Sequence, residues 1–386
     1  MTQSQVQHGA APSEGRADAL AGLDLWLLGA AAVLTLFGLL AISSASVEIA
    51  RKLHVGPNHF FLRQSVGVVL GVGAGLVVWR VPWRMLQRSG LPVYIGALLL
   101  LLLVWSPLGV SAKGATRWVN LGLFNLQPSE YAKLALCLVV ATFLSRNADR
   151  VEDFFGVTVP VIVLFAAMAG IVFVQKDLGT TALLMGITGV GLFVAGTPLR
   201  TLASLGAAGA GLGAIGIYIE PFRLERLANF MHPERDMLGA GYQVVQGWVA
   251  LSEGGLTGRG LGLGLAQHGY LPEPHTDMIL AVIAEELGVF GWLTVFALHG
   301  IVLARGMQIA ARASDLYGTL LAGLVSSLLA AQVIINAAVI GGLVPPKGLV
   351  LPFISYGASA VLAHWVAIAL LLRVGQRTHD VSHGVA

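Results

Sequence analysis

A few ionisable residues of this 386-residue chain lie in or beside strongly apolar segments, where charge is costly. Glu285 and Glu286 fall inside an apolar run, and Asp277 stands eight residues before Glu285. A positioned carboxylate can take a proton from a hydroxyl group, which makes Asp277 a candidate general base. Asp277 also suits a helix N-cap, the more common use of an aspartate there. Helix capping does not explain two adjacent glutamates inside an apolar helix, so at least one must face a polar cavity or a basic partner.

A second set of charges consists of Glu130, Lys133 and Asp177. Glu130 and Lys133 are three residues apart and therefore share one face of a helix. A local ion pair that holds the helix end explains them as well as a functional pair does. Asp177 lies in a turn between two apolar segments, and it would pair with Lys133 if the two helices pack together. That pair would support the wall of a cavity.

The composition of the chain indicates what kind of structural elements must position these residues. Hydrophobic residues make up 56% of the chain and charged residues only 11%, with a mean hydropathy of +0.79. Soluble domains carry about 25% charged residues, so a soluble enzyme and a disordered chain are both excluded. The single Cys137 excludes a disulfide framework within the chain, and the basic residues form no nucleic-acid patch.

We predict an all-α polytopic membrane protein, because apolar segments of about 20 residues cross a bilayer as helices. Close helix packing is also predicted, since Gly67, Gly71 and Gly75 recur at helical spacing. The sequence contains ten such segments, at residues 23–45, 60–79, 91–108, 129–145, 155–174, 179–197, 200–220, 279–304, 316–342 and 357–373.

The predicted organisation is one ten-helix transmembrane domain over residues 23–373 with a polar tail at each end, 1–22 and 374–386. One large exoplasmic loop, residues 221–278, joins the seventh and eighth helices. Loops of this length in a compact protein are usually functional or disordered.

The short loops set the orientation. Arginines fall between spans two and three, between spans eight and nine, and after span ten: Arg80, Arg84, Arg88, Arg305, Arg312, Arg373 and Arg377. The positive-inside rule makes that side cytoplasmic, and an even number of spans places both termini there. Basic residues on the opposite side then need a reason, and an anionic substrate is one: the candidates are Arg117, Arg223, Arg259 and Lys347.

Lys347 belongs to an unusual segment, residues 343–357, which holds three prolines yet is apolar. A re-entrant or broken-helix element that lines a cavity fits this composition better than a solvated loop does.

Five segments together resemble the SEDS family, which contains FtsW, RodA and SpoVE. They are KGATRW at 113–118, FNLQPSEYAK at 124–133, QKDLG at 175–179, the stretch 260–286 with its PEPHTD sequence, and KGLVLPFISYG at 347–357. The motifs occur in the family's order across nearly the whole membrane region. In detail they are somewhat more FtsW-like than RodA-like.

The resemblance implies a ten-helix peptidoglycan glycosyltransferase that polymerises lipid II at the outer face of the bacterial cytoplasmic membrane, for cell division or for elongation and shape. It implies that Asp277 is catalytic and that Lys133 and Asp177 form the charged pair of a central cavity. Its implied partners are the nascent glycan strand, a class B penicillin-binding protein, other division or elongation complex proteins and membrane lipids, with no nucleic acid. Thr116 and Met278 depart from the usual Arg and Phe, but no charged site residue is lost.

Two other functions stay open at this point, a lipid II flippase and a non-catalytic scaffold of the cell-wall synthesis complex. Transport requires a site that both faces can reach, whereas the suspicious residues lean toward the exoplasmic side. No cofactor is required by the residues, although a divalent cation, Mg or Mn, would help to stabilise a leaving pyrophosphate. We expect Arg117, Arg223, Arg259 and Lys347 to bind that group, and we expect Glu285 and Glu286 to join the cavity charges.

Overall fold

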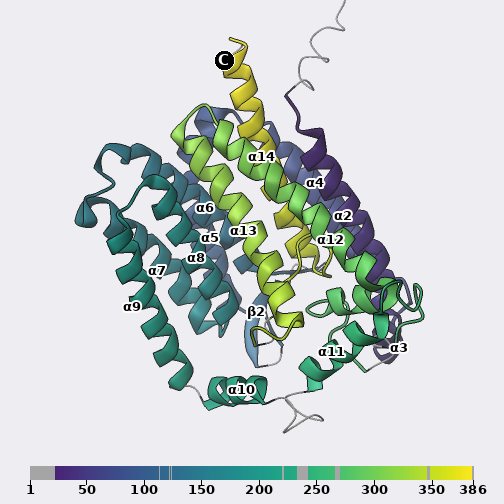
Figure 1. Cartoon of the computed structure of the whole chain (residues 1–386). Helices are drawn as coiled ribbons and strands as arrows, with labels where there is room; N and C mark the ends of the chain where they lie inside the picture. Colours follow the sequence, from purple (N-terminus) through teal and green to yellow (C-terminus); the bar gives the residue numbers. More distant parts are fainter. Residues whose placement is uncertain are drawn as a thin grey trace, which may run out of the picture.

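The computed structural model describes residues 22–112, 114–120, 122, 124–219, 221–232, 242–265, 270–345 and 348–384. Within these residues ten helices are long and apolar enough to cross a membrane (Figure 1). They are α2 (Leu25–Ala45), α4 (His59–Trp79), α5 (Trp83–Leu102), α6 (Pro128–Arg146), α7 (Val159–Val174), α8 (Leu178–Ala195), α9 (Leu199–Tyr218), α12 (Ile279–Arg312), α13 (Leu316–Ile340) and α14 (Ala358–Ser382). The predicted ten-helix membrane fold is confirmed.

Smaller elements gather at one end of the bundle, which we call the loop face (Figure 1). They are α3 (Val47–Lys52), α10 (Pro221–Met231), α11 (Tyr242–Gly254) and the strands β1 (Gly109–Ala112), β2 (Ala115–Asn120) and β3 (Asn125–Leu126). The strands form an antiparallel sheet in the order β1-β2-β3. This sheet is not evident from the sequence, because four- and six-residue strands in a polar connection carry little periodicity.

The opposite end of the bundle, the terminal face, holds the first and last described residues. Arg305 near the end of α12 forms an ion pair of 2.8 Å with Asp24 at the start of α2. Arg373 of α14 donates from Nε to the carbonyl oxygen of Val81, at 2.9 Å. The arginines of the short loops therefore gather at one end of the bundle, as the orientation argument requires.

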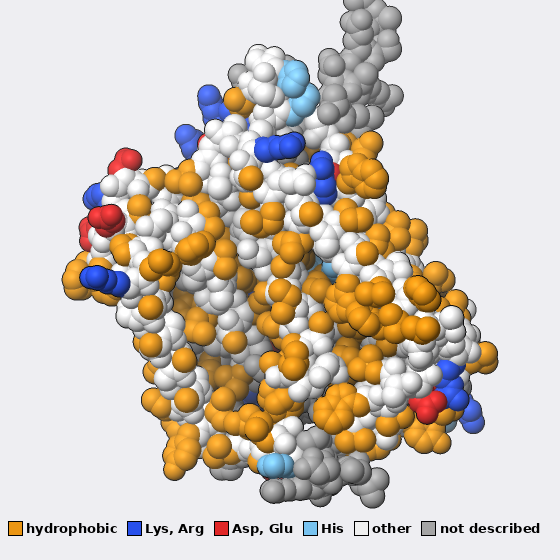
Figure 2. Space-filling view, in the orientation of Figure 1, with side chains coloured by type: hydrophobic (Ala, Val, Ile, Leu, Met, Phe, Trp, Pro, Cys, Tyr) orange, Lys and Arg blue, Asp and Glu red, His pale blue; other side chains and the backbone are white. Residues whose placement is uncertain are grey.

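Helix burial separates the centre of the bundle from its edge. In α6, 83% of the membrane-spanning window is buried, against 6% in α9. Hydrophobic side chains cover the middle of the visible surface, and most of its charged side chains lie toward the two ends (Figure 2). Such a belt is the surface that a bilayer requires.

The predicted glycine stripe brings α4 against α14. A Cβ atom on Gly67 would lie 2.6 Å from the Cα of Ala358, and one on Gly71 would lie 2.9 Å from the Cα of Leu362. These distances are shorter than any side chain tolerates, so glycine permits the approach. The contact places the start of α14, and the segment before it, next to α4.

Candidate active site

Two segments of the loop face are joined to each other, residues 271–278 before α12 and residues 348–357 before α14. The Ser355 hydroxyl donates to the carbonyl oxygen of Thr276 at 2.8 Å, and the Tyr356 backbone N–H donates to that of His275 at 2.9 Å. Irregular backbone in a membrane protein needs such internal partners. The two segments therefore form one structural unit.

Asn336 of α13 contacts both segments of this unit. Its buried side-chain Nδ2 donates to the carbonyl oxygen of Leu349 at 3.1 Å, with a longer contact of 3.5 Å to the carbonyl oxygen of Asp277. One amide group thus holds both segments at once. Sequence reasoning missed Asn336, because a single asparagine in an apolar helix carries no motif.

The Asp277 carboxylate faces Gly348. A Cβ atom added to Gly348 would lie 3.5 Å from Oδ2 and 3.7 Å from Oδ1 of Asp277. Asp277 is half-buried. Helix α12 has Met278 as its N-cap residue, so Asp277 is not the cap. Lys347, the neighbour of Gly348 in sequence, lies outside the described residues.

An aromatic cluster from three elements supports the unit. The rings of Phe60, His275 and Tyr356 lie edge-on or tilted, with centroids 4.8 to 5.3 Å apart. Arg63 lies one turn along α4 from Phe60, close enough for its positive charge to act on the Tyr356 hydroxyl. Burial raises the pKa of the Tyr356 hydroxyl, and the Arg63 charge opposes this rise only in part, so the hydroxyl keeps its proton at neutral pH.

Gln64 completes the attachment to α4. Its Nε2 donates to the Ser355 carbonyl oxygen at 3.3 Å, and its Oε1 accepts from the Gly357 backbone N–H at 2.9 Å. The apolar, proline-containing segment is thus held by side chains from neighbouring helices, as a re-entrant element requires.

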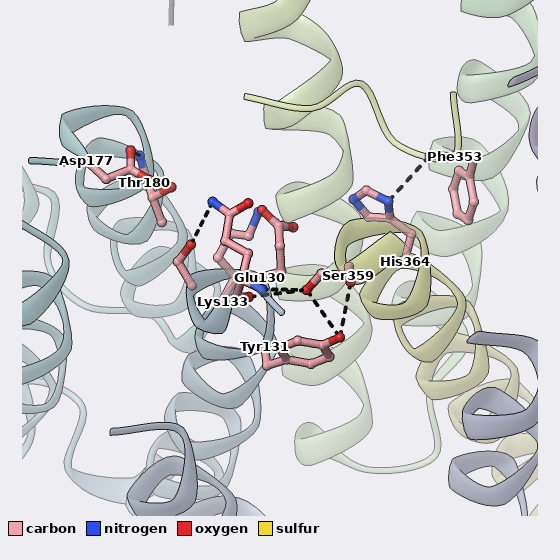
Figure 3. Close-up of polar contacts among 10 residues, drawn as sticks. Glu130, Tyr131, Lys133, Asp177, Thr180, Phe353, Ser359 and His364 are labelled. Carbon is pink, nitrogen blue, oxygen red and sulfur yellow. Dashed lines mark hydrogen bonds and ion pairs between the residues drawn. The ribbon is translucent and has the colours of Figure 1, made fainter. Parts of the chain in front are cut away.

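Glu130 and Lys133 form a buried ion pair in the first turns of α6 (Figure 3). Lys133 Nζ lies 2.7 Å from Glu130 Oε2, and both residues are almost completely buried. The local pair predicted from the three-residue spacing is therefore present.

Asp177 does not join that pair. Its Oδ1 accepts from the backbone N–H of Thr180 at 3.0 Å and its Oδ2 from the Thr180 hydroxyl at 2.9 Å, which makes it the N-cap of α8. Lys133 and Asp177 are both described, and they form no ion pair with each other. The predicted pair is absent from this structure: Lys133 pairs with Glu130 on its own helix, and Asp177 caps the first turn of α8.

The charged pair lies close to the start of α14 (Figure 3). The Gln127 backbone N–H donates to the Ser359 hydroxyl at 3.0 Å, and the Tyr131 hydroxyl donates to the Ser359 carbonyl oxygen at 3.3 Å. Since α14 follows directly on the 348–357 segment, α6 supports the position of that segment.

Removing one partner of the buried pair should destabilise the protein. We expect Lys133→Met to cost about 3–5 kcal/mol, because an unpaired Glu130 carboxylate would be left buried. The double variant Glu130→Gln/Lys133→Met should recover most of that loss. Thermal unfolding in detergent measures both, and a single variant as stable as the wild type would contradict the prediction.

Glu285 and Glu286 hold the glycine-rich loop 254–265. The Leu265 backbone N–H donates to Glu285 Oε1 at 2.7 Å, and that of Gly262 donates to Glu286 Oε1 at 3.1 Å. The Ser44 hydroxyl donates to Glu286 Oε1 at 2.6 Å. Both glutamates are buried, and these bonds anchor the loop. Glu285 also has the basic partner that the sequence called for, because its Oε1 lies 3.9 Å from Arg259 Nη1.

The same loop interrupts α12 at Gly288, which has φ 65° and ψ −159°. The backbone N–H groups of Arg259 and Gly260 donate to the carbonyl oxygens of Glu285 and Glu286, each at 2.9 Å. The loop thereby satisfies helix carbonyls that the break leaves without a helical partner. The sequence predicted an uninterrupted span here.

We expect Gly288→Ala to destabilise the protein by about 1–3 kcal/mol or more, because that backbone conformation is essentially restricted to glycine. The new Cβ would also lie 2.4 Å from the carbonyl oxygen of Leu256. Limited proteolysis of loop 254–265 and thermal unfolding measure the effect. Gly300→Ala, in open space on the same helix, is the matched control and should not lower stability.

The four basic residues predicted to bind an anion differ in their surroundings. Arg259 Nη1 lies 3.0 Å from Glu253 Oε2 and 3.9 Å from Glu285 Oε1, so its charge is already paired. Arg117 donates from Nε to the Gln175 carbonyl oxygen at 3.1 Å and from Nη2 to that of Lys176.

The side chains of Arg223 and Lys347 lie outside the described part of the chain, so the anion-binding role expected of them stays a prediction. The described residues contain no group of three or more His, Cys, Asp or Glu side chains that could hold a metal ion.

The fold and the site together define a polytopic membrane protein with an acidic site at one face of a ten-helix bundle. The family model FtsW/RodA/SpoVE, described as cell cycle protein, matches residues 25–380. The chain belongs to this family.

Curated relatives carry a more specific name. The probable peptidoglycan glycosyltransferase FtsW of Geobacter metallireducens is 38% identical over 355 residues, which cover 92% of this chain and 95% of that protein. The protein of the same name from Legionella pneumophila is 36% identical over 367 residues, 94% of this chain and 93% of that protein.

Two solved structures have the same fold. A chain from a study of how a peptidoglycan synthase complex coordinates polymerization and crosslinking has a TM-score of 0.77 and 29% identity, covering 93% of this chain and 99% of that chain. The rod shape determining protein RodA of Thermus thermophilus has a TM-score of 0.68 and 27% identity, covering 93% and 97%.

Proposed function

We propose that this chain is a peptidoglycan glycosyltransferase that polymerises lipid II into glycan strands. The observation that carries the proposal is the half-buried Asp277 carboxylate beside Gly348, held at one face of the bundle in a chain whose relatives are named for this activity. A site on one face suits a transferase better than a flippase, which needs access from both sides.

The reaction joins two lipid-linked sugars. The 4-hydroxyl oxygen of one disaccharide attacks the anomeric carbon of the other chain, and the bond from that carbon to undecaprenyl pyrophosphate breaks. Asp277 accepts the proton that the hydroxyl loses, a contribution of about 10²–10⁴-fold for a well-placed base. The pyrophosphate leaves with the bonding electrons and needs nearby positive charge.

That positive charge would come from Lys347, which adjoins Gly348 in sequence, with Arg117 and Arg223 as further candidates. Arg259 is a weaker candidate than the sequence suggested, because Glu253 and Glu285 already pair with it. A divalent cation, Mg or Mn, would reach the site with the pyrophosphate of the substrate, and no step above depends on it.

We place the loop face outside the bacterial cytoplasmic membrane, because the arginines of the short loops lie at the terminal face. Lipid II head groups and the nascent glycan strand would then meet Asp277 at the outer surface. We also propose a class B penicillin-binding protein as the partner that crosslinks the product, within a division or elongation complex.

Purified protein in detergent, supplied with labelled lipid II, tests the proposal. The reaction is run with the chain alone and with the class B penicillin-binding protein of the same genome, and products are separated by gel electrophoresis. Glycan strands are the expected product in at least one of the two reactions. Absence of polymer in both would overturn the proposal, and polymer in detergent cannot arise from flipping.

A further inference from the structure

A polar cavity opens at the terminal face, on the side of the molecule opposite Asp277. Its volume is about 460 Å³, and it lies where the start of α5, the end of α6 and the start of α13 meet. The residues that line it are Arg84, Gln87, Arg88, Ser145, Arg146, Asp315, Leu316 and Tyr317. None of these has a role in the proposed reaction.

The cavity carries uncompensated positive charge. Arg84, Arg88 and Arg146 are exposed, and none forms an ion pair with an acidic residue in the part of the chain that the structure describes. Arg146 makes one long hydrogen bond of 3.4 Å, to the carbonyl oxygen of Gln87. Three guanidinium groups in one concave site attract an anion, and a phosphate group matches their donor geometry.

The one acid of the cavity is already occupied by neutral donors. Asp315 accepts from Trp83 Nε1 at 2.9 Å, from Gln87 Nε2 at 3.1 Å and from the Gly318 backbone N–H at 2.7 Å. Its carboxylate serves as the N-cap of α13, and among the described residues it forms no ion pair with Arg84, Arg88 or Arg146. The lining has three positive groups and one negative group, a formal charge of +2.

An apolar stripe continues from the two arginines of α5. Steps of three or four residues place Arg84, Arg88 and the stripe on one face of the helix. The stripe consists of Leu91, Ile95, Leu99 and Leu102, which are 53%, 48%, 63% and 47% exposed. A soluble phosphate compound would make no use of this surface, whereas an acyl chain would lie along it.

We propose that this cavity binds the phosphate headgroup of an anionic phospholipid of the cytoplasmic leaflet, with an acyl chain along the α5 stripe. The arginines supply the charge, and the position at the ends of membrane-spanning helices places the cavity at headgroup depth. The lipid would hold the α5, α6 and α13 ends together. The proposal does not depend on the glycosyltransferase function.

Native mass spectrometry of the purified full-length protein tests this binding. Dioleoyl-phosphatidylglycerol is titrated against dioleoyl-phosphatidylcholine, which has the same tails and a neutral headgroup. The variant Arg84→Gln/Arg88→Gln/Arg146→Gln should bind phosphatidylglycerol on the order of 100-fold more weakly, since it loses the attraction of three basic side chains for the anionic headgroup. The control Arg150→Gln/Arg200→Gln/Arg312→Gln removes the same charge from exposed residues outside the cavity and should bind as the wild type does.

A second variant separates lipid binding from an effect of the lost charges on membrane insertion. Ser145→Phe fills the cavity without changing any charge, and it should reduce phosphatidylglycerol binding as the triple variant does. Equal binding by wild type and both variants, or equal binding of the two lipids, would overturn the proposal. Competition by millimolar sn-glycerol 3-phosphate as strong as that of the lipid would assign the site to a soluble phosphate and overturn the lipid.

Discussion

Replacing Asp277 by asparagine is expected to reduce lipid II polymerisation by about 10²–10⁴-fold, the range of a lost general base. Asparagine keeps the size and most hydrogen-bonding capacity of the side chain, but it cannot accept the proton of the attacking hydroxyl. The variant keeps the backbone contact to Asn336, which uses the Asp277 carbonyl oxygen, and thermal unfolding checks that the fold persists. Initial rates with labelled lipid II measure the loss.

Glu273→Gln is the matched control for this variant. Glu273 lies on the same segment and is also half-buried, and its carboxylate interacts with the Thr276 hydroxyl at 3.3 Å. The control should retain polymerisation within a few-fold of the wild type. If Asp277→Asn polymerises at the wild-type rate, Asp277 is not the base; if both variants lose activity equally, the segment and not the carboxylate is responsible.

Substituting Gly348 by valine is expected to lower the rate by about 10²-fold or more, the cost of a reacting group displaced by roughly 1 Å. The Cβ itself would make an ordinary contact of 3.5 Å with Asp277 Oδ2, and the two added methyl groups would crowd the carboxylate. On the proposed mechanism they would hinder the approach of the attacking hydroxyl. Gly348→Ala should lose less. Rates are compared with thermal unfolding in the same detergent, and stability should change little.

Gly56→Val provides the control for Gly348→Val. Gly56 is an exposed glycine between α3 and α4 with nothing near its Cβ position, so valine there should leave the rate unchanged. A Gly348→Val enzyme with full activity would show that substrate does not approach Asp277 past Gly348.

The ten-helix fold could be predicted because lipid imposes a length and an apolar composition on each span. The helix ends could not, because packing and local capping decide them. Helix α5 begins at Trp83, while the hydropathy of the sequence suggests a start near residue 91. The break at Gly288 was also hidden, since a glycine inside an apolar run is compatible with a helix until another segment packs against it.

Some residues of the candidate site could likewise be predicted from the sequence, and others could not. Asp277 could be singled out from its type and surroundings, while Asn336, Gln64 and Arg63 became visible only through the backbone and side-chain groups they contact. Their partners are separated from them by 13, 293 and 293 residues, and no local pattern reports such contacts.

The sequence by itself determined the number of spans, the end of the bundle at which arginines gather, and the Glu130–Lys133 pair, whose partners are one helical turn apart. Only the tertiary structure decided the partners of the remaining charges. Asp177 accepts hydrogen bonds from Thr180 of its own helix, and Glu285 and Glu286 accept them from the loop 254–265. A buried carboxylate bonds to the nearest donors that the packed chain presents. Which donors are nearest depends on how distant segments come together.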